Sequence, residues 1–331
     1  MNDLRLGLAL GAALRPAAWQ RVLGLVERAD QLGLHSVWLP EHHFHPGATP
    51  SPLIALSAFA ARSKRLRLAT TSLLLPVQHP LHVAAQVAAL DQLSGGRVLL
   101  GLGRGFRPPL FQAFGVAART KRDRFDEALE TMLAAWTGAD VALDGPHFGA
   151  ADAGVFRLGL RPHQVPHPPL VVAAFGPKGL AQAARHGLPY LASPLESLPI
   201  LEENYGAWRA GLERELDPRA PSVPVMRTAF LAADDTSAAR VWGALEREAR
   251  PQTGGPTPKA LARAAAGELE DRILVGTRSE VADRIAAYRE RLGMDLLVVR
   301  TEVPGASEAE REASLEALAE LVPAASDEPH R

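Results

Sequence analysis

Residues 66–102 read LRLATTSLLLPVQHPLHVAAQVAALDQLSGGRVLLGL. This stretch begins with an apolar run, Leu66–Ser72, continues with a segment of helical period, Pro80–Leu93, and ends with a second apolar run, Val98–Leu102. Short runs rich in Leu and Val that flank a helix are typical of parallel strands buried on both faces. The stretch therefore predicts a strand, a crossover helix and a second, parallel strand.

The same alternation extends over the rest of the chain. Further apolar runs occur at Leu4–Leu10, Ser36–Leu39, Leu170–Ala174, Tyr190–Ala192, Val223–Leu231 and Leu296–Arg300. Helical stretches lie between or after them at Pro16–Gly33, Lys121–Trp136, Gly179–Gly187, Leu198–Leu216, Thr277–Gly293 and Glu308–Leu321. Eight strands that alternate with helices make up a (β/α)8 barrel, so we predict an α/β protein with the TIM-barrel architecture. We see no linker and expect one domain over residues 1–331.

A doubly wound open sheet would show the same alternation. Its dinucleotide-binding form needs a G-x-G-x-x-G turn after the first strand, and Gly7 and Gly11 do not supply it. Gly101, Gly103 and Gly105 have the wrong spacing and follow the fourth run. We interpret these three glycines as a loop that brings the backbone close to a ligand.

Two stretches interrupt the alternation and predict insertions after strands 4 and 7. Ala139–Pro169 is rich in Gly and Pro, and Arg250–Asp271 contains a cluster of Gly and Pro before an Ala-rich piece. In a barrel, loops that follow strands lie over the catalytic face. We therefore consider 250–271 a candidate mobile lid, with a tolerated surface insertion as the alternative.

Composition narrows the possible functions. The chain has 36 Lys and Arg against 37 Asp and Glu, a formal net charge of −1, which gives no electrostatic basis for binding nucleic acid or an anionic membrane. It has no cysteine, which excludes disulfides, thiolate metal sites and a Cys nucleophile. Any redox chemistry must therefore come from a cofactor.

The N-terminal run Leu6–Leu14 resembles the apolar part of a signal peptide, but Asp3, Gly7 and Gly11 favour an opening buried strand. No uncharged apolar run approaches the ~18 residues that a membrane span needs. We predict a cytoplasmic protein without a membrane segment.

Polar side chains gather where the predicted strands end. Glu41, His42 and His43 follow the second run, at a position that faces the active site of a barrel. A hydrogen-bonded structural pair is one alternative. A metal site is another, disfavoured because adjacent histidines diverge on an extended strand, and we predict no metal.

Two further clusters follow the third and fourth runs. Thr70, Thr71 and Ser72 precede an apolar segment, a suitable surface for a flat heteroaromatic ring. Arg104 stands between two glycines and can reach a phosphate bidentately. An ion pair with a loop carboxylate is an equal alternative for Arg104.

The clusters, taken in order, resemble the bacterial luciferase-like flavin-dependent monooxygenase family. The matching pieces run nearly from end to end: Glu41-His42-His43-Phe44, Leu74-Leu75-Pro76 with His79-Pro80, residues 90–97, residues 101–105 with Phe114-Gly115, Pro166-His167-Pro168-Pro169, residues 183–189 and Val275-Gly276-Thr277. No single piece is specific, but the ordered set is.

The resemblance implies a (β/α)8 barrel, usually dimeric, that binds reduced FMN delivered by a separate flavin reductase. The reduced flavin reacts with O2 to form a C4a-hydroperoxide, which oxygenates a small apolar organic substrate. It further implies that His42 is the catalytic acid or base, and that Glu41 orients it or contacts the flavin. A cis peptide bond between Thr71 and Ser72 would lie beneath the isoalloxazine.

The resemblance also places the flavin phosphate at Arg104 and Gly105 and at the start of the helix after the fifth strand. There this chain reads Ala174-Phe175-Gly176-Pro177-Lys178-Gly179, where relatives commonly carry hydroxyl residues. Gly176 and Gly179 can still offer backbone amides, and Lys178 a charge. The acidic residue that often follows the Arg-Gly loop is replaced by Pro108-Pro109-Leu110.

Two other functions stay open within the resemblance. One branch of the family uses the deazaflavin F420 for hydride transfer, more often with an Asp-His pair where this chain has Glu41 and His42. The other possibility is a barrel that has lost catalysis and serves as a binding or partner subunit. The family dimerises through two helices that here correspond to Pro52–Ala61 and His82–Leu90, so we expect a homodimer.

Overall fold

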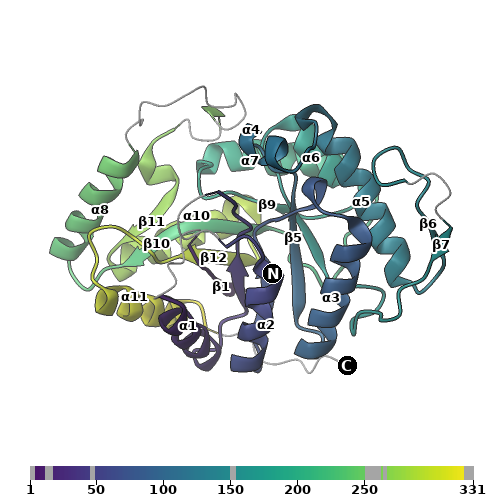
Figure 1. The fold of residues 1–331 in the computed structure, drawn as a ribbon. Coiled ribbons are helices and arrows are strands. Elements are labelled where there is room, and N and C mark those ends of the chain that lie inside the picture. Colours follow the sequence, from purple (N-terminus) through teal and green to yellow (C-terminus); the bar gives the residue numbers. More distant parts are fainter. Residues whose placement is uncertain are drawn as a thin grey trace. The chain divides into compact units, whose positions relative to one another are not determined.

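The structure is a computed structural model that describes residues 4–11, 18–44, 49–149, 154–249, 262–263 and 267–323. The chain forms two compact units. The first unit comprises Met1–Gly11, Arg28–Trp38 and Val171–Arg331, and the second comprises Ala12–Glu27 and Leu39–Leu170. Figure 1 labels the helices and many of the strands of both units.

The first unit contains a parallel sheet. Its strands are β1 (Arg5–Ala9), β2 (Ser36–Leu39), β8 (Leu170–Ala173), β9 (Tyr190–Leu191), β10 (Pro224–Leu231), β11 (Ile273–Gly276) and β12 (Leu296–Arg300). Strand β1 pairs with β2 and β12, β10 pairs with β12 and β11, and β8 pairs with β9, all in parallel. A parallel bridge between Ala192 and Val225 joins the end of β9 to β10.

The second unit contains β3 (Arg67–Thr70), β4 (Leu73–Leu74) and β5 (Val98–Gly103). Strands β3 and β4 both pair with β5 in parallel. Every residue of β5 is buried, which explains why this strand is an uninterrupted apolar run. Strands β6 (Val141–Ala142) and β7 (Val155–Phe156) form a small antiparallel pair inside the predicted insertion 139–169.

Helices follow most of the strands. They are α1 (Trp19–Gln31), α2 (Pro52–Arg62), α3 (Pro80–Ser94), α4 (Pro108–Ala113), α5 (Lys121–Trp136), α6 (Pro177–Arg185), α7 (Leu198–Ala210), α8 (Asp235–Ala249), α10 (Arg278–Leu292) and α11 (Glu308–Leu321), with the 3-10 turns η2 (Leu75–Val77), η3 (Ala118–Thr120) and η4 (Leu269–Asp271). A capping box of Thr277 and Glu280 starts α10. Gly95, with φ of 67°, ends α3 in the left-handed conformation that favours glycine. In the second unit, α3 contacts both α2 and α5 (Figure 1).

All eight predicted runs form strands, and the parallel α/β organisation is confirmed. Strand β11 escaped the sequence reasoning because its four residues directly precede the capping box that predicts a helix. It pairs with the C-terminal half of β10. Most of the lid candidate 250–271 lies outside the described residues; its end forms η4. In the described part of the chain, no helix is long and apolar enough to cross a membrane.

Candidate active site

A buried carboxylate, Glu41, organises the segments that follow β2 and β3 in the second unit. Its Oε2 accepts hydrogen bonds from the backbone N–H of Leu74 and from Nε2 of Gln78, both at 2.8 Å. Its Oε1 lies 2.7 Å from Nε2 of His43. Three donors on one carboxylate offset the cost of burying it. Glu41 therefore ties β4 and the residue after η2 to the chain that leaves β2.

Glu41 holds His43, whereas the expectation that Glu41 orients His42 or contacts the flavin stays a prediction. Side chains two residues apart in an extended segment point to the same side, whereas neighbours diverge. The backbone N–H of His42 donates to the carbonyl of Thr49 at 3.0 Å. A catalytic role for His42 stays a prediction. The sequence Glu41-His42-His43 could have predicted the contact with His43, because His43 is two residues from Glu41 and points to the same side of an extended segment.

Aromatic side chains surround the Glu41–His43 pair. The ring of His43 meets that of Phe114 edge-on at 5.0 Å between centroids, and Phe44 lies 6.1 Å from Phe114. A cavity of about 200 Å³ lies beside them, lined by Glu41, His43 and Phe114 together with residues of α2 and α3. A carboxylate–histidine pair in an apolar wall can move a proton next to an organic molecule.

The peptide bond between Thr71 and Ser72 is cis, as the family resemblance implies. The hydroxyl of Thr70 donates to the carbonyl of Gly101 at 2.9 Å and accepts from its N–H at 3.1 Å. Two residues further along β5, Gly103 is so close to Ser72 that a Cβ there would lie 1.9 Å from Ser72 Oγ. The predicted close approach at Gly103 is thus a contact with Ser72, the residue after the cis bond.

Gly103→Ala is expected to lower the free energy of unfolding by about 1–3 kcal/mol, the usual cost of overpacking. The new methyl group would meet both Oγ and Cβ of Ser72, so the segment after β3 must shift. Urea denaturation measures the change. Gly11→Ala is the matched control, because no atom of the described residues lies within 4 Å of a Cβ built there. Equal effects of the two substitutions would contradict the role assigned to Gly103.

Cations crowd together after β5. The pKa of Arg104 is lowered to about 10, first by burial and then by the charge of Arg122, while Asp126 raises it. The pKa of Lys121 is lowered by burial and by the charges of Arg104 and Arg122. Nζ of Lys121 donates to the carbonyl of Gly105 at 3.3 Å. Desolvated cations that repel one another favour an anionic ligand such as a phosphate.

Lys121 and Arg122 were missed by the sequence reasoning, although a signal was available. Both residues lie in the first turn of α5. Positive charge is unfavourable there, because the N-terminus of a helix carries a partial positive charge of its own. Lys121 and Arg122, beside the buried Arg104, are therefore candidates for holding an anion.

The predicted phosphate turn, Gly176 to Gly179, lies at the start of α6 in the first unit. Gly176 has φ of 73°, and its carbonyl accepts from the N–H of Gly179 at 3.1 Å and of Leu180 at 3.2 Å. The Gly179 amide is thus bonded within the turn, and its role in holding a phosphate stays a prediction. Pro177 has no N–H, so Gly176 and the exposed Lys178 are the donors that this turn can present.

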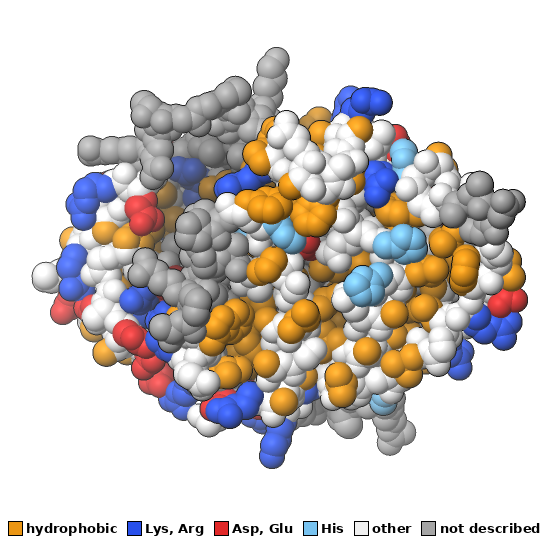
Figure 2. Space-filling model, viewed as in Figure 1, with side chains coloured by type: hydrophobic (Ala, Val, Ile, Leu, Met, Phe, Trp, Pro, Cys, Tyr) orange, Lys and Arg blue, Asp and Glu red, His pale blue; other side chains and the backbone are white. Residues whose placement is uncertain are grey.

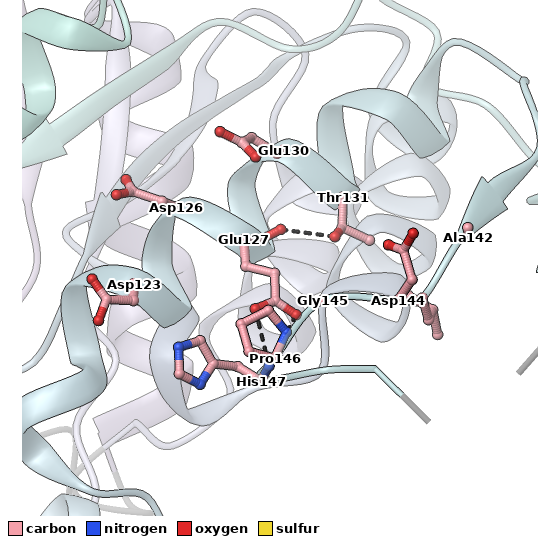
Figure 3. A pocket seen from close by; sticks show the side chains of 11 residues that line it. Asp123, Asp126, Glu127, Glu130, Thr131, Ala142, Asp144, Gly145, Pro146 and His147 are labelled. Carbon is pink, nitrogen blue, oxygen red and sulfur yellow. Dashed lines mark hydrogen bonds between the residues drawn. The ribbon is translucent and has the colours of Figure 1, made fainter. Parts of the chain in front are cut away.

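A larger cavity, of about 440 Å³, lies between α5 and residues 142–147 (Figure 3). Acidic side chains dominate its lining: Asp123, Asp126, Glu127, Glu130 and Asp144. Glu127 accepts hydrogen bonds from the backbone N–H of His147 and of Phe148, which fixes this segment to α5. Negative charge disfavours a phosphorylated cofactor here. Among the described residues, no group of His, Asp and Glu could hold a metal ion.

The model of the family described as luciferase-like monooxygenase matches residues 5–295 of the chain. The chain belongs to this family. The resemblance seen in the sequence is thereby confirmed, and the chain is a member of an oxidoreductase family.

Similar proteins cover most of this luciferase-like chain. The 4-hydroxyprotoasukamycin monooxygenase of Streptomyces nodosus subsp. asukaensis is 31% identical over 292 residues, 82% of this chain and 77% of that protein. The oxygenase component of flavin-dependent trigonelline monooxygenase from Acinetobacter baylyi is 26% identical over 340 residues, 93% and 90% of the two chains. The crystal structure of monooxygenase RslO1 from Streptomyces bottropensis has a TM-score of 0.81 and 30% identity, covering 96% of this chain and 98% of that one.

Other relatives of this luciferase-like protein match over a shorter part. The uncharacterized protein y4wF of Sinorhizobium fredii is 40% identical over 166 residues, so the match spans 50% of this chain and 48% of that protein. An F420-dependent glucose-6-phosphate dehydrogenase of Kineococcus radiotolerans is 33% identical over 196 residues, 56% of each chain. The relatives thus include a protein named as flavin-dependent and a protein named as F420-dependent.

Proposed function

We propose that this chain is a flavin-dependent monooxygenase that uses reduced FMN and O2 to oxygenate a small organic substrate with an apolar body. One oxygen atom enters the substrate and the other leaves as water, with both electrons from the reduced flavin. The observation that carries the proposal is the buried Glu41–His43 pair beside an apolar cavity, in a chain of the luciferase-like family. We also propose that the chain is one domain with the TIM-barrel architecture.

The residues present fit FMN. Bound FMN would supply the electrons that activate O2. Thr71 and Ser72 would contact its ring, and the desolvated cation cluster of Arg104 and Lys121, beside Gly105, suits its phosphate. A role of Gly176, Lys178 and Gly179 in holding the phosphate stays a prediction from the sequence.

In this proposal His42 gives or takes a proton near the flavin, a task suited to an imidazole because its ordinary pKa is close to neutral. Glu41 acts on the site through the three groups it holds. By fixing His43, Leu74 and Gln78, it sets the position of the segment that follows the cis bond.

A separate flavin reductase is the proposed partner, as the name of the Acinetobacter relative, an oxygenase component, suggests. F420-dependent hydride transfer is the second candidate function, favoured by the relative from Kineococcus. Survival as a non-catalytic binding or partner subunit is the third. A cytoplasmic location stays a prediction from the sequence.

The test is anaerobic titration of the purified protein with reduced FMN and with reduced F420, followed by mixing with O2. Binding of reduced FMN, and a transient absorbance expected of a flavin C4a-hydroperoxide, would support the monooxygenase. Binding of reduced F420 without reaction with O2 would replace it with hydride transfer. Binding of neither cofactor would favour a non-catalytic subunit.

We further propose a homodimer through α2 and α3. Figure 2 shows hydrophobic side chains gathered on the face over these helices. Ile54 of α2 is 68% exposed and Leu93 of α3 is 73% exposed, and the alanines of α3 would allow a second helix to approach closely. Buried apolar area would stabilise the pairing.

Ile54→Glu combined with Leu93→Glu is expected to convert the dimer to a monomer, because two charges on each subunit would lose their hydration at the interface. Light scattering at micromolar protein measures the mass. Leu160→Glu, at another exposed leucine of the second unit, is the control and should leave the mass unchanged. A wild-type monomer, or a double variant that still dimerises, would contradict this interface.

A further inference from the structure

The cavity of about 200 Å³ beside Glu41 lies wholly within the second unit. It is smaller than the ~300–1,000 Å³ of pockets that hold drug-sized ligands, so it suits a molecule with a single ring. Leu73, which lines it, directly follows Ser72, so the cavity adjoins the segment proposed to contact the flavin ring. Ile54 also belongs to the proposed dimer interface, so a second copy would shield part of the cavity from water. The apolar lining consists of Pro50, Pro52, Leu53, Ile54, Leu73 and Phe114.

Three aromatic rings gather next to this cavity. The ring centroids of His43 and Phe44 are 5.7 Å apart, those of His43 and Phe114 are 5.0 Å apart, and those of Phe44 and Phe114 are 6.1 Å apart. Phe44 is 68% exposed and has φ of 57°, a left-handed conformation that is unfavourable for a bulky residue, and Phe114 is 41% exposed. Backbone strain of this kind is concentrated at ligand sites. Exposed rings beside a cavity favour an aromatic ligand, which can pack against them edge-on or stacked.

Glu41 determines which hydrogen-bonding groups the cavity presents. A carboxylate only accepts hydrogen bonds, so Nε2 of His43, 2.7 Å from Glu41 Oε1, carries the proton. The neutral imidazole then keeps Nδ1 as an acceptor. Gln78 donates its Nε2 to Glu41 Oε2 in the same way, which leaves its Oε1 as an acceptor. Because His43 and Gln78 both line the cavity, a ligand there meets acceptors and needs a donor of its own.

The charge of the cavity excludes one class of ligand. Glu41 is its acidic residue, and the described lining contains no Lys or Arg. An anion would therefore meet a carboxylate without a compensating cation. An uncharged donor such as a hydroxyl group avoids this repulsion and still satisfies an acceptor.

We propose that this cavity binds the organic substrate, and that the substrate is an uncharged aromatic ring that carries a hydroxyl group. The hydroxyl donates to Nδ1 of His43, and the ring packs against Phe114. His43 is thereby a specificity-determining residue, whereas the proposed proton transfer near the flavin stays with His42. This inference rests on the proposed monooxygenase function and narrows its substrate class.

The test uses phenol and toluene, which have the same shape and differ in the hydroxyl group. Calorimetric titration of the full-length protein, with oxidised FMN present, is expected to give about 10-fold tighter binding of phenol, the usual effect of one hydrogen bond. His43→Phe keeps a ring but loses the acceptor, so it should abolish this preference. Phe114→Ala should weaken the binding of both probes about 2- to 10-fold, because each loses an aromatic contact. His163→Phe, at an exposed histidine of the same unit that does not line the cavity, is the control and should change neither affinity.

The outcomes separate this inference from the proposed function. Equal affinities of the wild-type protein for phenol and toluene would overturn it, even if His43→Phe failed to fold. A phenol preference that His43→Phe retains would overturn the role of His43, and tighter binding of benzoate than of phenol would overturn the uncharged class. The reaction of reduced FMN with O2 is measured separately, so the monooxygenase proposal can stand while the substrate class fails. A phenol preference in a protein that does not bind reduced FMN would instead leave the cavity site in place and remove the flavin function.

Discussion

His42→Ala is expected to lower turnover about 100- to 10,000-fold, the usual contribution of a positioned acid or base. Affinity for reduced FMN should change little, because the ring and phosphate contacts proposed for the flavin lie on other residues. Stopped-flow mixing of the reduced FMN complex with O2 gives the rates.

His43→Ala is the decisive comparison for this prediction. The two histidines are adjacent, and it is His43 whose Nε2 lies 2.7 Å from Oε1 of Glu41. We expect His43→Ala to lose much less turnover than His42→Ala, because Glu41 keeps its bonds to Leu74 and Gln78. The reverse order would transfer the catalytic role to the Glu41–His43 pair. If both variants kept full turnover, neither histidine would have a catalytic role.

The strands could be predicted because each is an apolar run between turn residues. Val98–Leu102 is typical, since a strand buried on both faces must be apolar throughout. Strand β11 could not be predicted, because four residues that pair with the end of β10 carry no periodicity of their own. The pairing partner decides whether such a segment becomes a strand.

The site was predictable in its residue types and less so in its contacts. Glu41, the histidines and Arg104 stand out because polar residues at strand ends are unusual in so apolar a sequence. The cis bond at Thr71 was predictable only from the family, since no local pattern marks it. Gln78 and Ser72 acquire their roles through contacts with Glu41 and Gly103, distant in sequence, which spacing alone does not reveal.

Arg104→Met is expected to weaken binding of reduced FMN about 10- to 100-fold, because a phosphate would lose a charge-assisted pair of hydrogen bonds. Equilibrium dialysis or flavin fluorescence measures the affinity. Riboflavin, which lacks the phosphate, should bind the variant and the wild-type protein equally. Equal affinity of both proteins for FMN would place the phosphate elsewhere.

The same substitution should not destabilise the protein, and this separates a binding role from a structural one. In the free protein the charge of Arg104 is opposed by its burial and by Arg122, as its lowered pKa indicates. Burial and Arg122 disfavour this charge more than Asp126 favours it, so its removal should leave the free energy of unfolding little changed. Its loss also removes a cation that lowers the pKa of Lys121, so that pKa should rise. Weaker FMN binding with an unchanged or higher melting temperature would therefore identify Arg104 as a residue kept for its ligand, whereas a clear fall in melting temperature would indicate a structural ion pair.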